Sequence, residues 1–150
     1  MHGCTKVRYR SLGNVLADRG VNVANTTALS AGDLYTTGQA ALGFENYANR
    51  LREDIDITIS GESREFDIFA AGAPEIMKSI QGGTVAACPG VTLFDASGNC
   101  QPSGITCLLG VPASSTHISL CNIAVTSASD QATGEQIAVA SLMAAAYTCE

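Results

Sequence analysis

The sequence predicts a mainly α-helical single domain: a bundle of four or five helices with an irregular segment held by disulfides. Three observations favour this fold class. Apolar residues recur every three or four positions along several stretches, which is the spacing of one helix face. A chain of 150 residues, 46% of them hydrophobic, is long enough to form one core, so we predict one domain over residues 1–150. Finally, residues 82–115 are rich in glycine, proline and cysteine, which interrupt regular structure and allow cross-linking.

The N-terminal third contains two predicted helices. Residues 6–19 place four apolar side chains near one face, and Gly20 is a typical C-terminal stop. Ser30, followed three residues later by Asp33, resembles a capping box, which marks the start of a helix. The apolar pattern that follows predicts a helix over residues 31–52.

The clearest helical pattern begins near Ser63, a candidate N-cap, and ends before Gly82. Its apolar positions recur at spacings of three and four residues: Phe66, Phe69, Ala70, Ala73, Met77 and Ile80. Pro74 lies inside this pattern and lacks a backbone donor, so we expect a break in the helix near Gly72.

Two further helices are predicted near the C-terminus. Residues 114–116 offer serine and threonine N-caps for a helix that ends near Val125. Asp130 or Thr133 begins the last helix, whose apolar stripe consists of Ile137, Ala140, Met143, Ala144 and Tyr147.

The alternative fold class is α+β with a small sheet. Isoleucines alternate with polar residues across residues 54–60, which is the pattern of a half-buried strand. Its partners in the sheet would be residues 91–94 and 105–109, and both of these segments are short.

The six cysteines carry the strongest covalent signal in the sequence. Four of them lie in or beside the irregular segment: Cys88, Cys100, Cys107 and Cys121. We predict disulfides there, with Cys88–Cys100 and Cys107–Cys121 as the most local pairing. Cys149 then either pairs with Cys4 or stays free. Reduced, buried thiols are the alternative, because unpaired cysteine is among the most buried residue types.

A metal or catalytic site on these residues is a second alternative. His117 and Cys121 are four residues apart, so they share one face if the segment is helical. Together with Cys100 and Cys107 they would form a Cys3His set suited to zinc. The cysteine spacings do not match a known zinc or redox signature, and we predict no cofactor and no catalytic residue.

Cys4 is a candidate lipidation site. Glycine immediately before cysteine, as in Gly3-Cys4, is how a bacterial lipoprotein signal ends, and a lipidated cysteine would anchor the protein at a membrane surface. An ordinary cysteine near the terminus is the alternative. The cysteine content and the net charge of −6 favour an exported protein, in the periplasm, at the cell surface or outside the cell.

The distribution of charge argues against nucleic-acid binding. All eight lysines and arginines lie between Lys6 and Lys78. Beyond Lys78 the chain has no lysine or arginine, and its acidic residues are Asp95, Asp130, Glu135 and Glu150. A phosphate-binding surface needs clustered cations, so we expect no nucleic-acid partner. No apolar run reaches the length of a transmembrane span.

These features predict a non-enzymatic protein of the structural or interaction class, an accessory subunit that presents a rigid surface to a protein partner or a larger assembly. The main alternative is a helical domain that binds a small molecule or cofactor in an apolar interior. That interior would be lined by Phe66, Phe69, Met77 and Tyr147. An enzyme or zinc site that uses Cys121 and His117 is the third prediction.

Overall fold

A computed structural model describes residues 5–147 of the chain; residues 1–4 and 148–150 lie outside that description. The described part forms six α-helices and one short 3-10 helix: α1 (Tyr9–Asp18), α2 (Ala31–Thr37), η1 (Tyr47–Asn49), α3 (Ile59–Gln81), α4 (Pro102–Leu109), α5 (Ser115–Ser127) and α6 (Gln131–Tyr147). The predicted mainly α-helical class is therefore confirmed, with more helices than the four or five expected.

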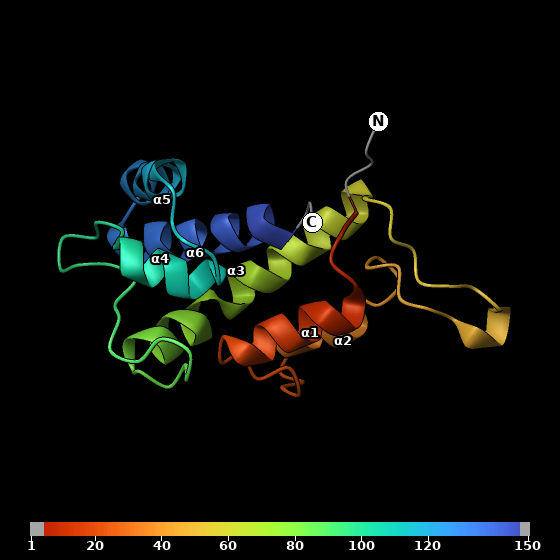
Figure 1. The fold of residues 1–150 in the computed structure, drawn as a ribbon. Helices are drawn as coiled ribbons and strands as arrows, with labels where there is room; N and C mark the ends of the chain where they lie inside the picture. Colours follow the sequence, from red (N-terminus) through yellow and green to blue (C-terminus); the bar gives the residue numbers. More distant parts are fainter. Residues whose placement is uncertain (1–4, 148–150) are drawn as a thin grey trace.

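Helix α3 runs through the middle of the molecule and organises the other helices (Figure 1). It packs against α2 on one side and α6 on the other, and α5 packs on α6. One cluster of buried side chains joins these elements, with fully buried residues from four different helices: Leu16, Phe69, Ile76, Leu108 and Met143. The segment that carries η1 extends away from this body, at the end opposite to α5 (Figure 1).

The helix predicted over residues 31–52 is much shorter than expected. Ser30 caps it as predicted, with its Oγ accepting the Asp33 N–H at 3.2 Å, but α2 ends at Thr37. A Cβ at Gly38 would meet the Arg64 side chain at 2.9 Å, so glycine allows the chain to leave the helix close to α3. Gly43 then adopts φ +68°, a conformation that glycine tolerates and other residues disfavour. The turn that follows leads into the extended segment.

Helix α3 is continuous, and the predicted break near Gly72 is wrong. The helix also begins earlier than Ser63, because the Thr58 side chain accepts the Gly61 N–H at 3.0 Å and caps it. Pro74 removes one backbone donor, but the buried residues on both sides of it hold the helix together through packing: Ile68, Phe69, Ala73, Ile76 and Ile80. Tertiary contacts therefore outweigh the local cost of the proline.

The segment over residues 82–115 is not irregular throughout, because it contains α4. Pro102 stands at the start of this helix, where its missing N–H costs nothing, and Gly110 ends it in the left-handed conformation. A turn over residues 95–99 precedes it, with the Asp95 carboxylate accepting the backbone N–H groups of Ser97 and Asn99 at 2.9 Å each. Chain-breaking residues here mark the ends of a helix rather than its absence.

The alternative α+β fold is wrong for the described residues. Residues 105–109 belong to α4, and residues 54–60 form the approach to α3 and its first turn. Within residues 5–147 the only β pairings are three isolated bridges: Thr5 with Asp56, Asn46 with Leu51, and Phe94 with Cys100. Of the alternating isoleucines, Ile55 and Ile57 therefore lie in the approach to α3, and Ile59 is the first residue of that helix.

The two C-terminal helices begin where predicted. Ser114 and His117 form a reciprocal capping box at α5, and Asp130 caps α6 by accepting the Thr133 N–H at 2.9 Å. The predicted apolar stripe of α6 is only partly right, since Ile137 is exposed while Ala138 and Val139 are fully buried. Helix α6 lies between α3 and α5, so it buries more than one face.

Candidate interaction surfaces

The four central cysteines form two disulfides, and the predicted local pairing is wrong. Cys88 is joined to Cys107, with Cα atoms 5.8 Å apart, and Cys100 is joined to Cys121, with Cα atoms 6.2 Å apart. The two loops therefore interleave along the chain. The Cys100 N–H donates to Asn122 Oδ1 at 2.9 Å, which holds the Cys100 backbone against α5 next to Cys121.

The zinc site and the Cys/His pair predicted as alternatives are wrong, because their sulfurs are oxidised. Cys100, Cys107 and Cys121 all belong to disulfides, so no thiolate remains among them to bind metal or act as a nucleophile. His117 Nδ1 instead accepts the Ser114 N–H at 3.1 Å. The part of the chain from residue 5 to 147 holds no cluster of metal-binding side chains. Cys4 and Cys149 lie outside the described residues, and so does the predicted lipidation at Cys4.

The predicted apolar interior does not form one cavity wall. Phe69 is fully buried, with its ring centre 6.2 Å from that of Tyr147, whereas Phe66 is 38% exposed. An apolar hollow lies elsewhere, between α5 and α6. Small-molecule binding stays a prediction.

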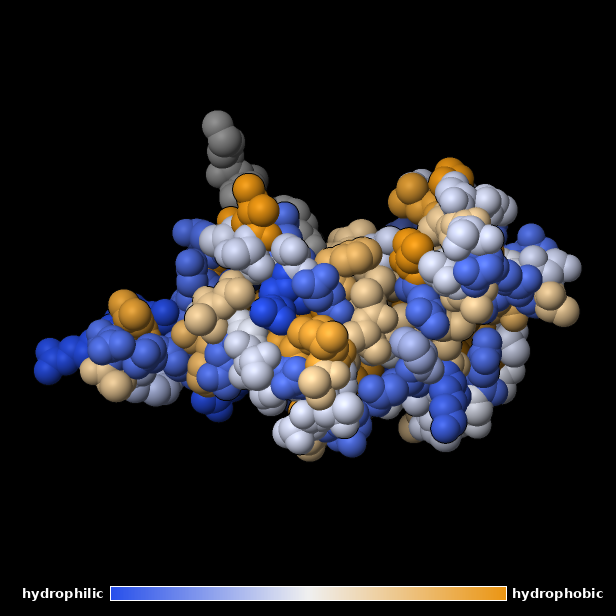
Figure 2. Space-filling view, turned by 180° about the vertical axis from the view of Figure 1, so that it is seen from behind, coloured by the Kyte–Doolittle hydropathy of each residue, from blue (hydrophilic) through white to orange (hydrophobic). Residues whose placement is uncertain are grey.

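We call this hollow the α5–α6 groove. Its volume is about 270 Å³, and its lining comes from two helices: His117, Leu120, Ile123 and Ala124 of α5, with Ala138, Ser141, Leu142, Ala145 and Ala146 of α6. Leu120 and Ile123 are 53% and 56% exposed. Hydrophobic residues gather on this side of the molecule over α5 and α6 (Figure 2). Because Cys121 and Val125 are buried against the core, α5 is apolar on two faces and only one is covered.

A second exposed feature is the projecting segment of residues 45–53, which we call the arm. Asn46 and Leu51 pair their backbones through two hydrogen bonds of 3.0 and 2.9 Å, and η1 forms the tip between them. Arg50 follows η1 with φ 56°, in the left-handed region that non-glycine residues rarely occupy. Tyr47 and Leu51 are 79% and 59% exposed. The arm thus holds two large apolar side chains outside the body of the protein.

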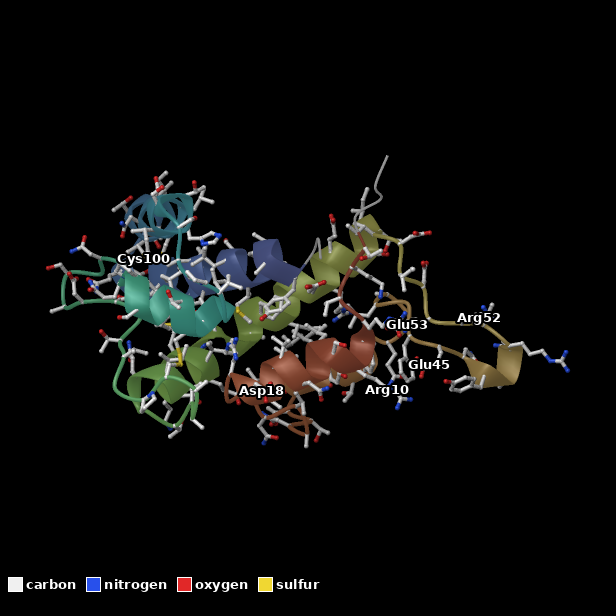
Figure 3. The ribbon with its side chains drawn as sticks, viewed as in Figure 1. Arg10, Asp18, Glu45, Arg52, Glu53 and Cys100 are labelled. Atoms are coloured by element: carbon white, nitrogen blue, oxygen red, sulfur yellow. A yellow bond between two sulfur atoms is a disulfide. The ribbon has the colours of Figure 1, made fainter. Side chains whose placement is uncertain are left out.

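The base of the arm is fixed to α1 by charged and aromatic contacts (Figure 3). Arg10 pairs with Glu45 at 2.9 Å, and Glu53 Oε1 accepts the Tyr9 N–H at 2.6 Å. Partial burial raises the pKa of Glu45, but hydrogen bonds from its own backbone N–H and from Arg10 outweigh it, so the pKa is lowered overall. The Phe44 ring centre lies 4.5 Å from that of Tyr9. These contacts orient the arm against a helix.

Sequence reasoning missed Glu65, the one buried charged side chain among residues 5–147. It is 3% exposed, and its Oε1 has no hydrogen-bond partner. Burial raises its pKa to about 7, with Lys6 lowering it and Glu62 raising it further. The carboxyl group therefore exchanges its proton near neutral pH. Its spacing from Ile68 and Phe69 on one helix turn was the only signal in the sequence that it faces the core.

The fold and its cross-links define a disulfide-bonded helical protein. Disulfides of this kind indicate an oxidising, non-cytoplasmic compartment. In the described part, no helix combines the length and apolar character needed to cross a membrane. Comparisons with protein-family models, curated proteins and solved structures found no match.

Proposed function

We propose that this is an exported, non-enzymatic interaction protein, an accessory subunit that presents the arm to a protein partner. The observation that carries the proposal is the arm itself, where Tyr47 and Leu51 are exposed beside two arginines on a segment fixed at its base. Tyrosine and arginine are the residue types that most often dominate the energy of protein interfaces. A fixed base lowers the entropy lost when such a segment binds.

The chemistry of the arm specifies the kind of partner. The two acidic side chains at its ends are engaged with α1, Glu45 by Arg10 and Glu53 by the Tyr9 N–H. In the described chain, the side chains of Arg50 and Arg52 make no hydrogen bond or ion pair, and both residues are exposed. Figure 3 shows Arg52 farther out on the arm than Glu53. The partner surface should therefore combine an apolar hollow with acidic side chains at its edge.

Photo-cross-linking in the native source tests this proposal. A photoreactive amino acid replaces Tyr47 in one variant and Ala28, an exposed residue between α1 and α2, in the matched control. We expect a discrete protein adduct from position 47 and none from position 28. Equal adducts from both positions, or none from position 47, would contradict an interaction through the arm.

The place of action within the exported compartments is also part of the proposal. We propose that Cys4 is lipidated and holds the protein at a membrane surface, because Gly3-Cys4 matches the end of a bacterial lipoprotein signal. Intact mass of the native-source protein, before and after reduction, tests this. An acyl adduct on the N-terminal peptide supports the anchor. An unmodified Cys4 with the two disulfides present leaves an exported protein without a lipid anchor.

A further inference from the structure

The α5–α6 groove has the features that the arm requires of a partner. It is an apolar hollow of about 270 Å³ whose outer wall, Leu120 and Ile123, is more than half exposed. Single exposed apolar residues are ordinary, whereas an apolar hollow between two helices is a place where side chains of a partner can be buried. The charges around the groove indicate which kind of partner would occupy it.

Acidic groups stand at one end of this groove. Asp130 caps α6 and Glu135 lies in its second turn, about one helical turn before the lining residue Ala138. Hydrogen bonds from the Thr133 backbone and side chain lower the pKa of Asp130, so it is charged at neutral pH. Neither α5 nor α6 contains a lysine or an arginine. The groove is therefore apolar with a negative edge.

The arm carries the complementary pattern. Tyr47 and Leu51 supply apolar side chains, and Arg50 and Arg52 supply positive charge beside them, without partners within residues 5–147. Opposite charges around an apolar contact fix its register and speed its formation. Both halves of one interface are thus present on the same chain.

The two halves lie at opposite ends of the molecule, so one chain cannot close the contact on itself. Figure 1 places η1 and the arm at one end, and α5 at the other. A contact between unlike surfaces of two copies is heterologous, and it propagates into a ring or an open filament.

We propose that the arm of one copy docks in the α5–α6 groove of a second copy. Tyr47 and Leu51 enter between α5 and α6, and Arg50 and Arg52 face Asp130 and Glu135. This inference rests on the proposed function and names its partner as another copy of the same chain. A short hairpin buries less surface than the roughly 1,200 Å² of stable interfaces, so the contact is weak and depends on protein concentration and salt.

Sedimentation velocity on the oxidised full chain tests the proposal with two complementary variants. The arm variant carries Tyr47→Ala and Leu51→Ala, and the groove variant carries Leu120→Glu. Ser119→Glu is the matched control, because Ser119 is exposed on α5 but does not line the groove. All four substitutions are at exposed positions, and circular dichroism with disulfide mapping checks that each of the three variants is folded.

We expect the wild type and Ser119→Glu to associate as concentration rises to about 1 mM, where even a contact with a Kd near 1 mM is visible. Each complementary variant alone should stay monomeric. Their equimolar mixture should form a one-to-one dimer, because the intact arm of the groove variant fits the intact groove of the arm variant. Added sodium chloride should weaken that dimer.

Several results would overturn the proposal: a wild type that remains monomeric, variants that still associate alone, or a mixture that stays monomeric. If the mixture of the two variants forms no dimer but position 47 still cross-links to a different protein, then self-association is rejected and the proposed function stands. If cross-linking from position 47 also fails, both are wrong. An apolar small molecule in the groove would show as additional mass on the native protein together with a monomeric wild type, which also overturns docking by the arm.

Discussion

Two regions of this molecule share one apolar core but supplement it by different means. The region from Val85 to Val125 contains two interleaved disulfides and a largely apolar interior, with Leu93 and Leu108 fully buried. The region from residue 5 to residue 58 has no disulfide among its described residues; its buried apolar side chains, such as Leu12 and Leu16, are supplemented by aromatic contacts and side-chain hydrogen bonds. Covalent links act mainly on the unfolded chain, whereas polar contacts depend on geometry and protonation.

Two tyrosines show how the uncross-linked region is ordered. The rings of Tyr9 and Tyr35 stack with centres 4.3 Å apart. Each hydroxyl also donates to the other residue's backbone carbonyl, at 3.1 Å from Tyr9 and 3.0 Å from Tyr35. Burial raises the pKa of Tyr35 well above its ordinary value, so its hydroxyl remains a donor. The stacked rings and the two hydrogen bonds fix α1 against α2 without a covalent link.

The largest expected effect is the loss of both disulfides. Replacing all four bonded cysteines with serine should lower the free energy of unfolding by about 6 kcal/mol, because each loop of about 20 residues contributes about 3 kcal/mol in the chain-entropy model. Urea unfolding of this variant and of each single-bridge variant measures the effect. A loss below about 1 kcal/mol would show that the apolar core alone orders this region.

Tyr9→Ala should have the next largest effect, about 4 kcal/mol, because it removes a buried ring and both of its aromatic contacts. Tyr9→Phe is the control and should cost about 1 kcal/mol, since it keeps the ring and removes only the hydroxyl, which donates to the Tyr35 carbonyl and accepts from Gln39 Nε2 at 3.4 Å. Similar losses in both variants would mean that the hydroxyl, and not the stacked rings, holds α1 on α2.

Glu65→Gln, on the central helix α3 that joins the two regions, should make the stability of the fold less dependent on pH. The folded pKa of Glu65 is raised to about 7, so its proton stabilises the fold below about pH 4.5, and that stability is lost as the pH rises to 7. The neutral variant should match the wild type near pH 4.5 and exceed it by up to about 3 kcal/mol at pH 8. Urea unfolding at several pH values measures the difference, and a constant difference across that range would contradict the assignment.

Arg50→Gly should have the smallest effect on stability and the opposite sign. Glycine adopts φ 56° without the penalty that a side chain incurs, so the free energy of unfolding should rise by up to about 1 kcal/mol. The same change removes a cation from the arm, so self-association should weaken. A variant that is less stable than the wild type would show that the Arg50 side chain supports the arm through contacts with the body.

The sequence was sufficient for the helical class and for several helix starts, because caps are local. Ser30, Ser114 and Asp130 all cap helices at or beside the predicted positions. The continuity of α3 through Pro74 could not be predicted, because it depends on packing against α2 and α6. Local rules describe where a helix is favoured, while distant contacts decide whether it continues.

The surfaces were harder to predict than the helices. Leu120 and Cys121 are adjacent and both apolar, yet one is exposed and the other buried, because Cys121 is bonded to Cys100 and faces the other helices. The disulfide pairing was predicted wrongly because it also depends on distant contacts. The Cys100 N–H donates to Asn122 Oδ1, 22 residues later in the sequence, and this bond places Cys100 beside α5. Short sequence separation favoured Cys88–Cys100 and Cys107–Cys121, whereas the fold brings together Cys88 with Cys107 and Cys100 with Cys121.

The interleaved disulfides also determine how the chain responds to a protease. Any single peptide bond cleaved between Cys88 and Cys121 is spanned by at least one bridge, so the two fragments stay covalently joined. A single cut in the arm is spanned by neither of these bridges. Cleavage between Cys88 and Cys121 would therefore separate the fragments only after reduction. After cleavage in the arm, neither the Cys88–Cys107 nor the Cys100–Cys121 disulfide would join the two fragments.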